Sequence, residues 1–205
     1  MAITYPLAFP TTKGLRRITI RMRSNAGVDE SPYTFEQQAQ AGQGDAMGAD
    51  ITIPPMVRAD AEAFIAFLWA LDGRAGTFLM GDPLGTSPRG TWAGSPKVLG
   101  AHAQRAKSIA MDGFTAGATV KAGDWIQTGS GSSTHLHKVV QDATADGSGL
   151  LTLEIRPGLR AALADNDTFV TASAKGLWRL ASNVREYSID LAQMYGVSFS
   201  AVEAL

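Results

Sequence analysis

The sequence contains no cysteine among its 205 residues. This absence excludes disulfide frameworks, cysteine-ligated zinc sites, iron–sulfur clusters and thiol nucleophiles. An excess of charge of one sign is also missing, because 18 basic residues are balanced by 19 acidic residues. A chain with almost no net charge has no overall electrostatic attraction for nucleic acid or anionic lipid. We therefore expect no sequence-specific nucleic-acid binding.

Long hydrophobic runs are missing as well. The longest nearly apolar run, Ala61 to Leu71, contains Glu62 and is too short to span a bilayer. The first ten residues lack a basic region followed by a long apolar stretch, so they do not resemble a signal peptide. We expect a protein that is made in the cytoplasm and is not inserted into a membrane.

Sequence motifs of nucleotide binding and hydrolysis are absent too, including the Walker loop, GxGxxG, GxSxG and HExxH. His135 and His137 lie two residues apart in a strand pattern and therefore share one face. We interpret them as an exposed pair beside a Gly/Ser-rich loop, because no third metal ligand has a suitable spacing. The sequence thus predicts no catalytic, metal-binding or cofactor-binding residue, and it predicts a protein that is not an enzyme.

Strand and turn signals fill the first part of the chain. Ile18, Ile20 and Met22 alternate with polar residues, as in a half-buried strand. Clusters of Gly, Asn, Asp and Pro mark the turns between strands. The expected order is a strand at 14–25, a turn at 24–32, a strand at 32–40, a glycine-rich loop at 42–48 and a strand at 49–54.

One amphipathic helix is predicted over 59–72. This span lacks Gly and Pro, and its apolar residues recur at spacings of three and four. Those residues are Ala61, Phe64, Ile65, Leu68 and Leu71. Gly73 suits the left-handed conformation that ends many helices, and a strand at 77–80 follows.

The second part of the chain begins with a Pro/Gly/Ser/Thr-rich linker at 83–94. Short strands with turn signals every ~8–12 residues follow, which is typical of a small barrel or sandwich. The strands are expected at 97–99, 106–111, 124–128, 136–140, 150–155 and 168–172, with two more at 184–192 and 196–203.

Two sets of residues are candidates for binding. The arginines of the first strand, Arg17, Arg21 and Arg23, lack the interleaved aromatics of a nucleic-acid site. We expect them to pair with Glu36 on the next strand, or with an acidic surface of a partner subunit. Trp92 and Trp125, with His135 and His137, are candidates for a binding surface, although most tryptophans in β-domains are buried anchors.

The order of several motifs resembles the distal tail and minor tail-tip proteins of long-tailed bacteriophages. The sequence T-I-P-P-M is followed by a helix with F-x-x-F-L and then by G-R-A-G-T-F-L-M-G-D-P. The stretch V-K-A-G-D-W-I at 120–126 and the stretch at 136–160, which begins with L-H-K-V-V-Q-D, resemble a β-barrel segment of phage tail proteins. The motifs W-R-L-A, E-Y-S-I-D-L-A and G-V-S-F-S-A-V-E resemble their closing strands. These motifs cover most of the chain discontinuously.

The resemblance implies a mainly β fold in two parts. Residues 1–88 and 175–205 would form a β-sandwich belt domain with one packed α-helix, and 89–174 would form an inserted small β-barrel, OB-like or galectin-like. It further implies a structural virion protein at the phage tail tip or baseplate. Such a protein forms a ring, expected to be a hexamer, that joins the tail tube protein to the tail tip hub protein. The alternative is a carbohydrate-binding or hydrolytic tail component that acts on the host surface through the insert.

Overall fold

The computed structural model describes residues 3–11 and 14–205, and it is mainly β with one α-helix. Two sheets form the bulk of the molecule, and each has its own cluster of buried apolar side chains. Within the described residues, no helix has the length and apolar character needed to cross a bilayer.

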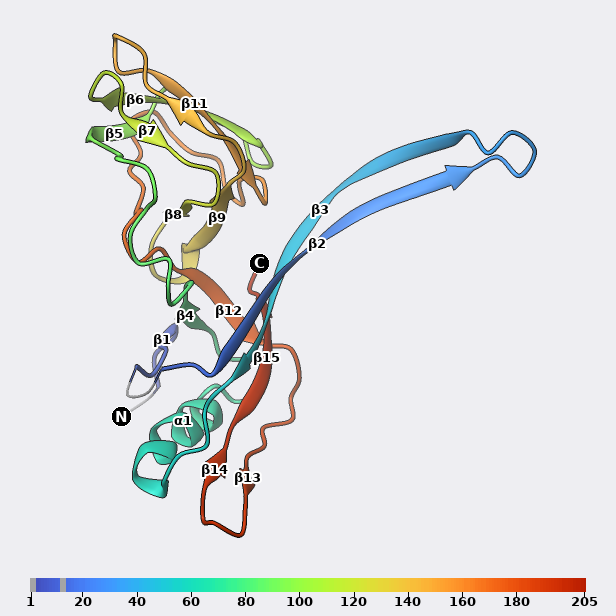
Figure 1. Cartoon of the computed structure of the whole chain (residues 1–205), viewed down its shortest axis with the longest axis vertical. Helices are drawn as coiled ribbons and strands as arrows, with labels where there is room; N and C mark the ends of the chain where they lie inside the picture. Colours follow the sequence, from blue (N-terminus) through green and yellow to red (C-terminus); the bar gives the residue numbers. More distant parts are fainter. Residues whose placement is uncertain (1–2, 12–13) are drawn as a thin grey trace.

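The first sheet has six strands and draws on both ends of the chain (Figure 1). Its order is β1 (Leu7–Ala8), β4 (Phe78–Met80), β12 (Gly176–Leu180), β15 (Ser198–Glu203), β3 (Gln37–Thr52) and β2 (Arg17–Glu30). Neighbours are antiparallel except for β1 and β4, which are parallel. The strands β12 and β15 therefore lie between strands from the first half of the chain.

The helix α1 (Arg58–Ala70) covers one face of this sheet. It buries Ala61, Phe64, Ile65 and Leu68, as the spacing of these residues predicts, and it also buries Phe67. Phe67 packs edge-on against Phe78 of β4, with ring centroids 5.3 Å apart. The chain turns just after the helix, where Gly73 has a φ of 65°. The first core is thus a layer of aromatic and aliphatic side chains between α1 and the sheet.

The second sheet is formed within residues 94–156 and is antiparallel throughout. Its order is β5 (Gly94–Val98), β6 (Ser108–Phe114), β11 (Leu151–Arg156), β9 (His135–Val139) and β8 (Trp125–Thr128). It curls into a half-barrel around the second cluster of buried side chains, which includes Ile109, Met111 and Leu153. The remaining elements are β7 (Thr119–Val120) paired with β10 (Ala143–Thr144), η1 (Gly131–Ser133), and β13 (Ser188–Ile189) paired with β14 (Tyr195–Gly196).

Several sequence-based boundaries are wrong. Residues 24–30 of the expected turn belong to the long strand β2, and the expected loop at 42–48 belongs to the long strand β3. The expected strand at 32–40 instead contains the turn between them. The residues at 168–172 form only an isolated bridge through Val170, and the span 184–192 contains only the two-residue β13. Strand β12 is not marked by periodicity, because it is buried along nearly its whole length and does not alternate, and only the W-R-L-A motif of the resemblance falls on it.

A substitution in the helix tests how α1 is held. Leu68 is 3% exposed, whereas the adjacent Trp69 is 62% exposed. Leu68→Ala should lower the free energy of unfolding by about 2–5 kcal/mol, because it removes a buried side chain and leaves a cavity. Trp69→Ala is the control and should change it by less than about 1 kcal/mol. Urea unfolding followed by circular dichroism gives both values, and equal losses would contradict this packing.

Candidate assembly interface

Strands β2 and β3 continue beyond the sheet as a two-stranded arm, defined here as residues 24–45 (Figure 1). The stretch of β2 and β3 that precedes the arm is called its base, and it pairs from Arg17 opposite Thr52 to Ser24 opposite Asp45. The outer part pairs from Ala26 opposite Ala41 to Glu30 opposite Gln37. Strand β15 pairs with β3 only along Gly48–Thr52, so it does not extend the sheet along the arm. Among residues 3–11 and 14–205, no other strand pairs with either backbone edge of the arm, and both edges can therefore pair with another chain.

A bulge separates the outer arm from its base. The ladder advances by two residues on β2, from Ser24 to Ala26, and by four on β3, from Asp45 to Ala41. The extra residues include Gly42, where a Cβ atom would lie 2.3 Å from the carbonyl oxygen of Asn25. A side chain at this position would therefore collide with the backbone of β2. The glycine-rich segment is a bulge and not a loop, because its glycines allow the two strands to approach closely.

The tip of the arm is a tight turn that presents aromatic side chains to solvent. Ser31 N–H donates to the Glu36 carbonyl over 2.9 Å, and Phe35 N–H donates to the Ser31 carbonyl over 2.9 Å. Phe35 has a φ of 57°, an uncommon conformation for a residue with a side chain. Tyr33 is 92% exposed and Phe35 is 73% exposed. Two large aromatic side chains at one exposed turn mark a surface suited to contact with another molecule.

Charge is separated along this hairpin. Residues 24–44 contain three carboxylates, Asp29, Glu30 and Glu36, and no Lys or Arg. The first half of the same strand β2 carries three exposed arginines on its outer face, Arg17, Arg21 and Arg23. Arg21 binds Asp50 of β3, which also accepts a hydrogen bond from Ser200, and these bonds hold the pKa of Asp50 below its usual value. Across the described residues, Arg17 and Arg23 form no ion pair.

The expected pairing of these arginines with Glu36 inside one chain is wrong. The arginines lie opposite residues 46–52 of β3, whereas Glu36 belongs to the turn at the far end of the arm. The error follows from the expected turn at 24–32, because a turn there would have placed the expected strand at 32–40 directly beside the first strand. An acidic surface on a partner subunit stays a prediction for these arginines.

The half-barrel is held against the first sheet by strands β8 and β9. Their residues alternate between the two cores, as neighbouring positions on a strand point to opposite faces. Trp125 and Leu136 join the first core, while Ile126 and Val139 join the second. Gly176 allows a close approach here, because a Cβ atom on it would lie 2.9 Å from the Cβ of Leu136.

An ion pair between the partly buried Arg160 and the buried Glu203 fixes the same junction. Arg160 donates two hydrogen bonds to the Glu203 carboxylate, from Nε over 2.8 Å and from Nη2 over 2.6 Å. Glu203 also accepts the backbone N–H of Met47 over 3.0 Å. Removing one partner of such a pair would leave an uncompensated charge, so this contact strongly constrains how the two sheets are oriented.

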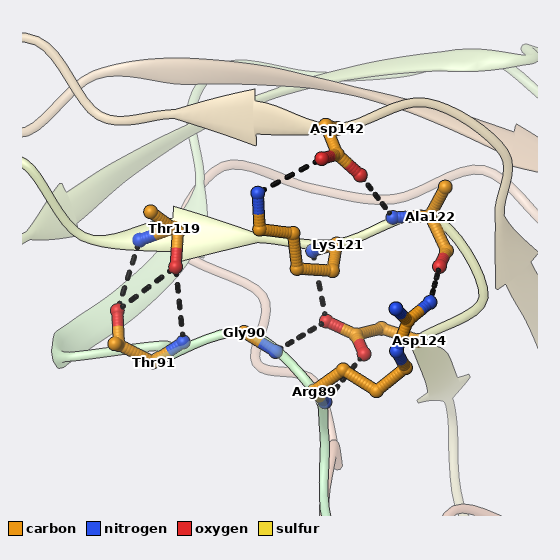
Figure 2. Close-up of polar contacts among 8 residues, drawn as sticks. All are labelled: Arg89, Gly90, Thr91, Thr119, Lys121, Ala122, Asp124 and Asp142. Atoms are coloured by element: carbon orange, nitrogen blue, oxygen red, sulfur yellow. Dashed lines mark hydrogen bonds and ion pairs between the residues drawn. The ribbon is translucent and has the colours of Figure 1, made fainter.

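Asp124 holds the linker before the half-barrel in place (Figure 2). Its carboxylate accepts the backbone N–H groups of Arg89, Gly90 and Lys121, and also Nε1–H of Trp92 over 2.9 Å. Burial by itself would raise the pKa of Asp124, but these four hydrogen bonds outweigh it and hold the pKa below its usual value. The group is an anchor for the chain, since all four donors come from the protein itself.

Neither tryptophan candidate offers a ring face to a ligand. Trp92 is 8% exposed and packs against Phe114, with ring centroids 5.8 Å apart. Trp125 is 7% exposed, donates Nε1–H to Asp82 over 3.1 Å, and has Lys138 Nζ 4.5 Å from its ring centroid. Both are therefore anchors, one within the half-barrel and one at its junction with the first sheet.

The interpretation of the histidines as an exposed pair is wrong. His137 is fully buried, donates Nδ1–H to the Pro157 carbonyl over 2.9 Å, and accepts a hydrogen bond from the Thr128 hydroxyl over 3.2 Å. Burial lowers the pKa of His137 to about 4 and lowers that of the half-buried His135 as well. Among residues 3–11 and 14–205, no three His, Asp or Glu side chains are grouped to hold a metal ion.

In a comparison with known proteins, no family model and no curated protein matches the chain. The arm is the feature that sequence reasoning missed. Its one signal is the run of residues 24–44 without Lys or Arg, bounded on one side by arginines.

An Asp124→Asn substitution tests the anchor. An amide can accept only at its oxygen and places an NH₂ group against at least one N–H donor, so we expect a loss of about 1–3 kcal/mol at neutral pH. The pKa of Asp124 is lower in the folded protein than in the unfolded chain, where it is about 3.9. The carboxylate therefore stabilises the fold fully at a pH above about 3.9, and this stabilisation is lost as the pH falls through the pKa of the folded protein.

The difference between wild type and Asp124→Asn should therefore shrink below about pH 4. Asp112→Asn is the matched control, because Asp112 lies in strand β6 of the half-barrel and makes no side-chain hydrogen bond in the described part of the chain. Thermal unfolding across pH 3–7 gives the comparison. A difference that stays constant with pH would contradict the role given to the charge.

Proposed function

We propose that this protein is a structural component of a bacteriophage tail and assembles into a ring that joins the tail tube to the tail tip or baseplate. The observation that carries the proposal is the arm, whose backbone edges and aromatic tip contact no other element in the described part of the chain. A two-stranded hairpin is at best marginally stable by itself in water. An arm of this length is therefore best explained as an element that another subunit completes.

The sequence resemblance to distal tail and minor tail-tip proteins supports the proposal that the assembly is part of a phage tail. The T-I-P-P-M segment, the helix and the following strand are the motifs that carry this resemblance, and they pack together in the first core. The resemblance suggests six copies, located in the virion at the tail tip, with the tail tube protein and the tail tip hub protein as neighbours. The junction of the two sheets supports a mechanical role, because the ion pair between Arg160 and Glu203 and two shared strands resist relative movement.

The alternative of a carbohydrate-binding or hydrolytic component loses its expected binding surface. Saccharides stack on exposed aromatic rings, and both Trp92 and Trp125 are buried. A saccharide-dependent change in tryptophan fluorescence from a monomer would favour this alternative over the ring.

Shortening the arm tests the proposed assembly. Residues 25–44 can be replaced by Asn-Gly, which suits a two-residue turn between the paired Ser24 and Asp45. The wild-type protein should form a single oligomer of about six subunits, and the shortened protein should stay monomeric and still unfold in one cooperative thermal transition, because the deletion spares both hydrophobic cores. Sedimentation velocity measures both masses, and electron microscopy of the wild type should show rings.

Two results would contradict the proposal. One is a wild-type protein that stays monomeric at all accessible concentrations. The other is a shortened protein that assembles as well as the wild type. Antibody labelling of phage particles provides an independent check, with label expected at the junction between tail tube and tip.

A further inference from the structure

The opposite charges of the arm and its base cannot neutralise each other within one copy. Seven residues separate Arg23 from Glu30 along β2, which corresponds to roughly 23 Å of strand. The Debye length at physiological ionic strength is about 8 Å, so exposed charges at this separation are screened from each other. The tip therefore presents net negative charge to the surroundings, and the base presents net positive charge although Asp50 offsets part of it.

The arginine face adjoins a groove that suits an aromatic side chain. Asp50, which binds Arg21, lines a groove with a volume of about 400 Å³. This volume lies within the roughly 300–1,000 Å³ of pockets that hold small ligands. The apolar lining includes Leu68, Leu180 and Val184, and the polar lining includes Asp50, Arg185 and Glu186. The groove combines apolar and polar contacts next to a basic strand.

We propose that the arm tip of one copy, residues 29–36, docks on the arginine face and the adjoining groove of a second copy. The proposal rests on the proposed assembly and specifies which two surfaces meet in it. Asp29, Glu30 and Glu36 would lie against Arg17 and Arg23, while Tyr33 or Phe35 enters the groove. The chain itself supplies the complementary charge, which identifies a second copy as the occupant.

This contact is heterologous, because the donating tip and the accepting face are different surfaces of the same chain. Each copy gives one tip and receives another, so the contact repeats from subunit to subunit. Such a contact closes into a ring when the rotation between neighbours permits it. The geometry therefore accounts for a ring without a second kind of interface.

Charge reversal tests the contact directly. The tip-reversed protein carries Asp29→Lys with Glu36→Lys, and the face-reversed protein carries Arg17→Glu with Arg23→Glu. None of these four residues forms an ion pair in the described part of the chain, so both proteins should fold normally. Each alone should assemble with an apparent dissociation constant raised roughly tenfold or more, because like charges then face each other.

A 1:1 mixture of the two reversed proteins should recover the wild-type mass. In the mixture every basic tip can meet an acidic face and every acidic tip can meet a basic face, so the two proteins alternate around an even-numbered ring. Lys97→Glu with Lys175→Glu is the control for the face-reversed protein, with the same change in net charge at two exposed sites that do not line the groove, and it should assemble like the wild type. Sedimentation velocity at low and high salt measures the wild type, the two reversed proteins, their mixture and the control.

The absence of native cysteine allows a second test by crosslinking. Tyr33→Cys with Val184→Cys places one thiol on the tip and one in the groove, and a short bismaleimide should join neighbouring copies into a ladder of oligomers. Tyr33→Cys with Lys97→Cys is the control and should give no ladder.

The outcomes separate this proposal from the ring itself. Reversed proteins that assemble like the wild type, a mixture that does not recover, or an assembled protein that gives no ladder would each overturn the docking while leaving the ring in place. A wild-type protein that never assembles would instead overturn the proposed function.

Discussion

Backbone pairing on both edges of β3 is the interaction on which the rest of the structure depends. One edge pairs with β15 along Gly48–Thr52 and ties the strand into the sheet, and the other edge pairs with β2 as far as the arm tip. Met47, Ala49 and Ile51 on the inner face are buried in the first core. The arm is therefore a continuation of a core strand, and a load on its tip passes directly into the centre of the sheet.

The half-barrel depends on this same frame. Strands β8 and β9 use one face for their own core and the other face for the first core, so neither core is complete without them. Glu203, at the end of β15, receives both Arg160 and the backbone of β3. A single carboxylate thus joins the half-barrel, the closing strand and the strand that carries the arm. Rigid connection of these parts is consistent with the proposed role in a ring, in which each copy would hold its neighbours at a fixed spacing.

The sequence predicts the parts of this fold that have one buried face. The helix is identifiable from its stripe of apolar residues, and most strands of the half-barrel are identifiable from their alternation. The arm is not, because both of its faces lie in water and no hydrophobic period marks it. Its Gly and Asn residues resemble turn signals although they form a bulge. For His137 and Trp125, alternation shows on which face of its strand each side chain lies. It does not show whether another element covers that face, because this depends on how the half-barrel packs against the first sheet.

The separation of charge along the hairpin also discriminates against wrong contacts. A free strand edge can pair with any other free edge, which is a route to aggregation. Two arm tips brought together would place six carboxylates side by side, three from each copy. Two arginine faces would repel each other in the same way. Since like charges disfavour both of these pairings, the tip-to-face arrangement is the one that the charges favour. The residues that provide attraction in the proposed contact thus also set its direction around the ring.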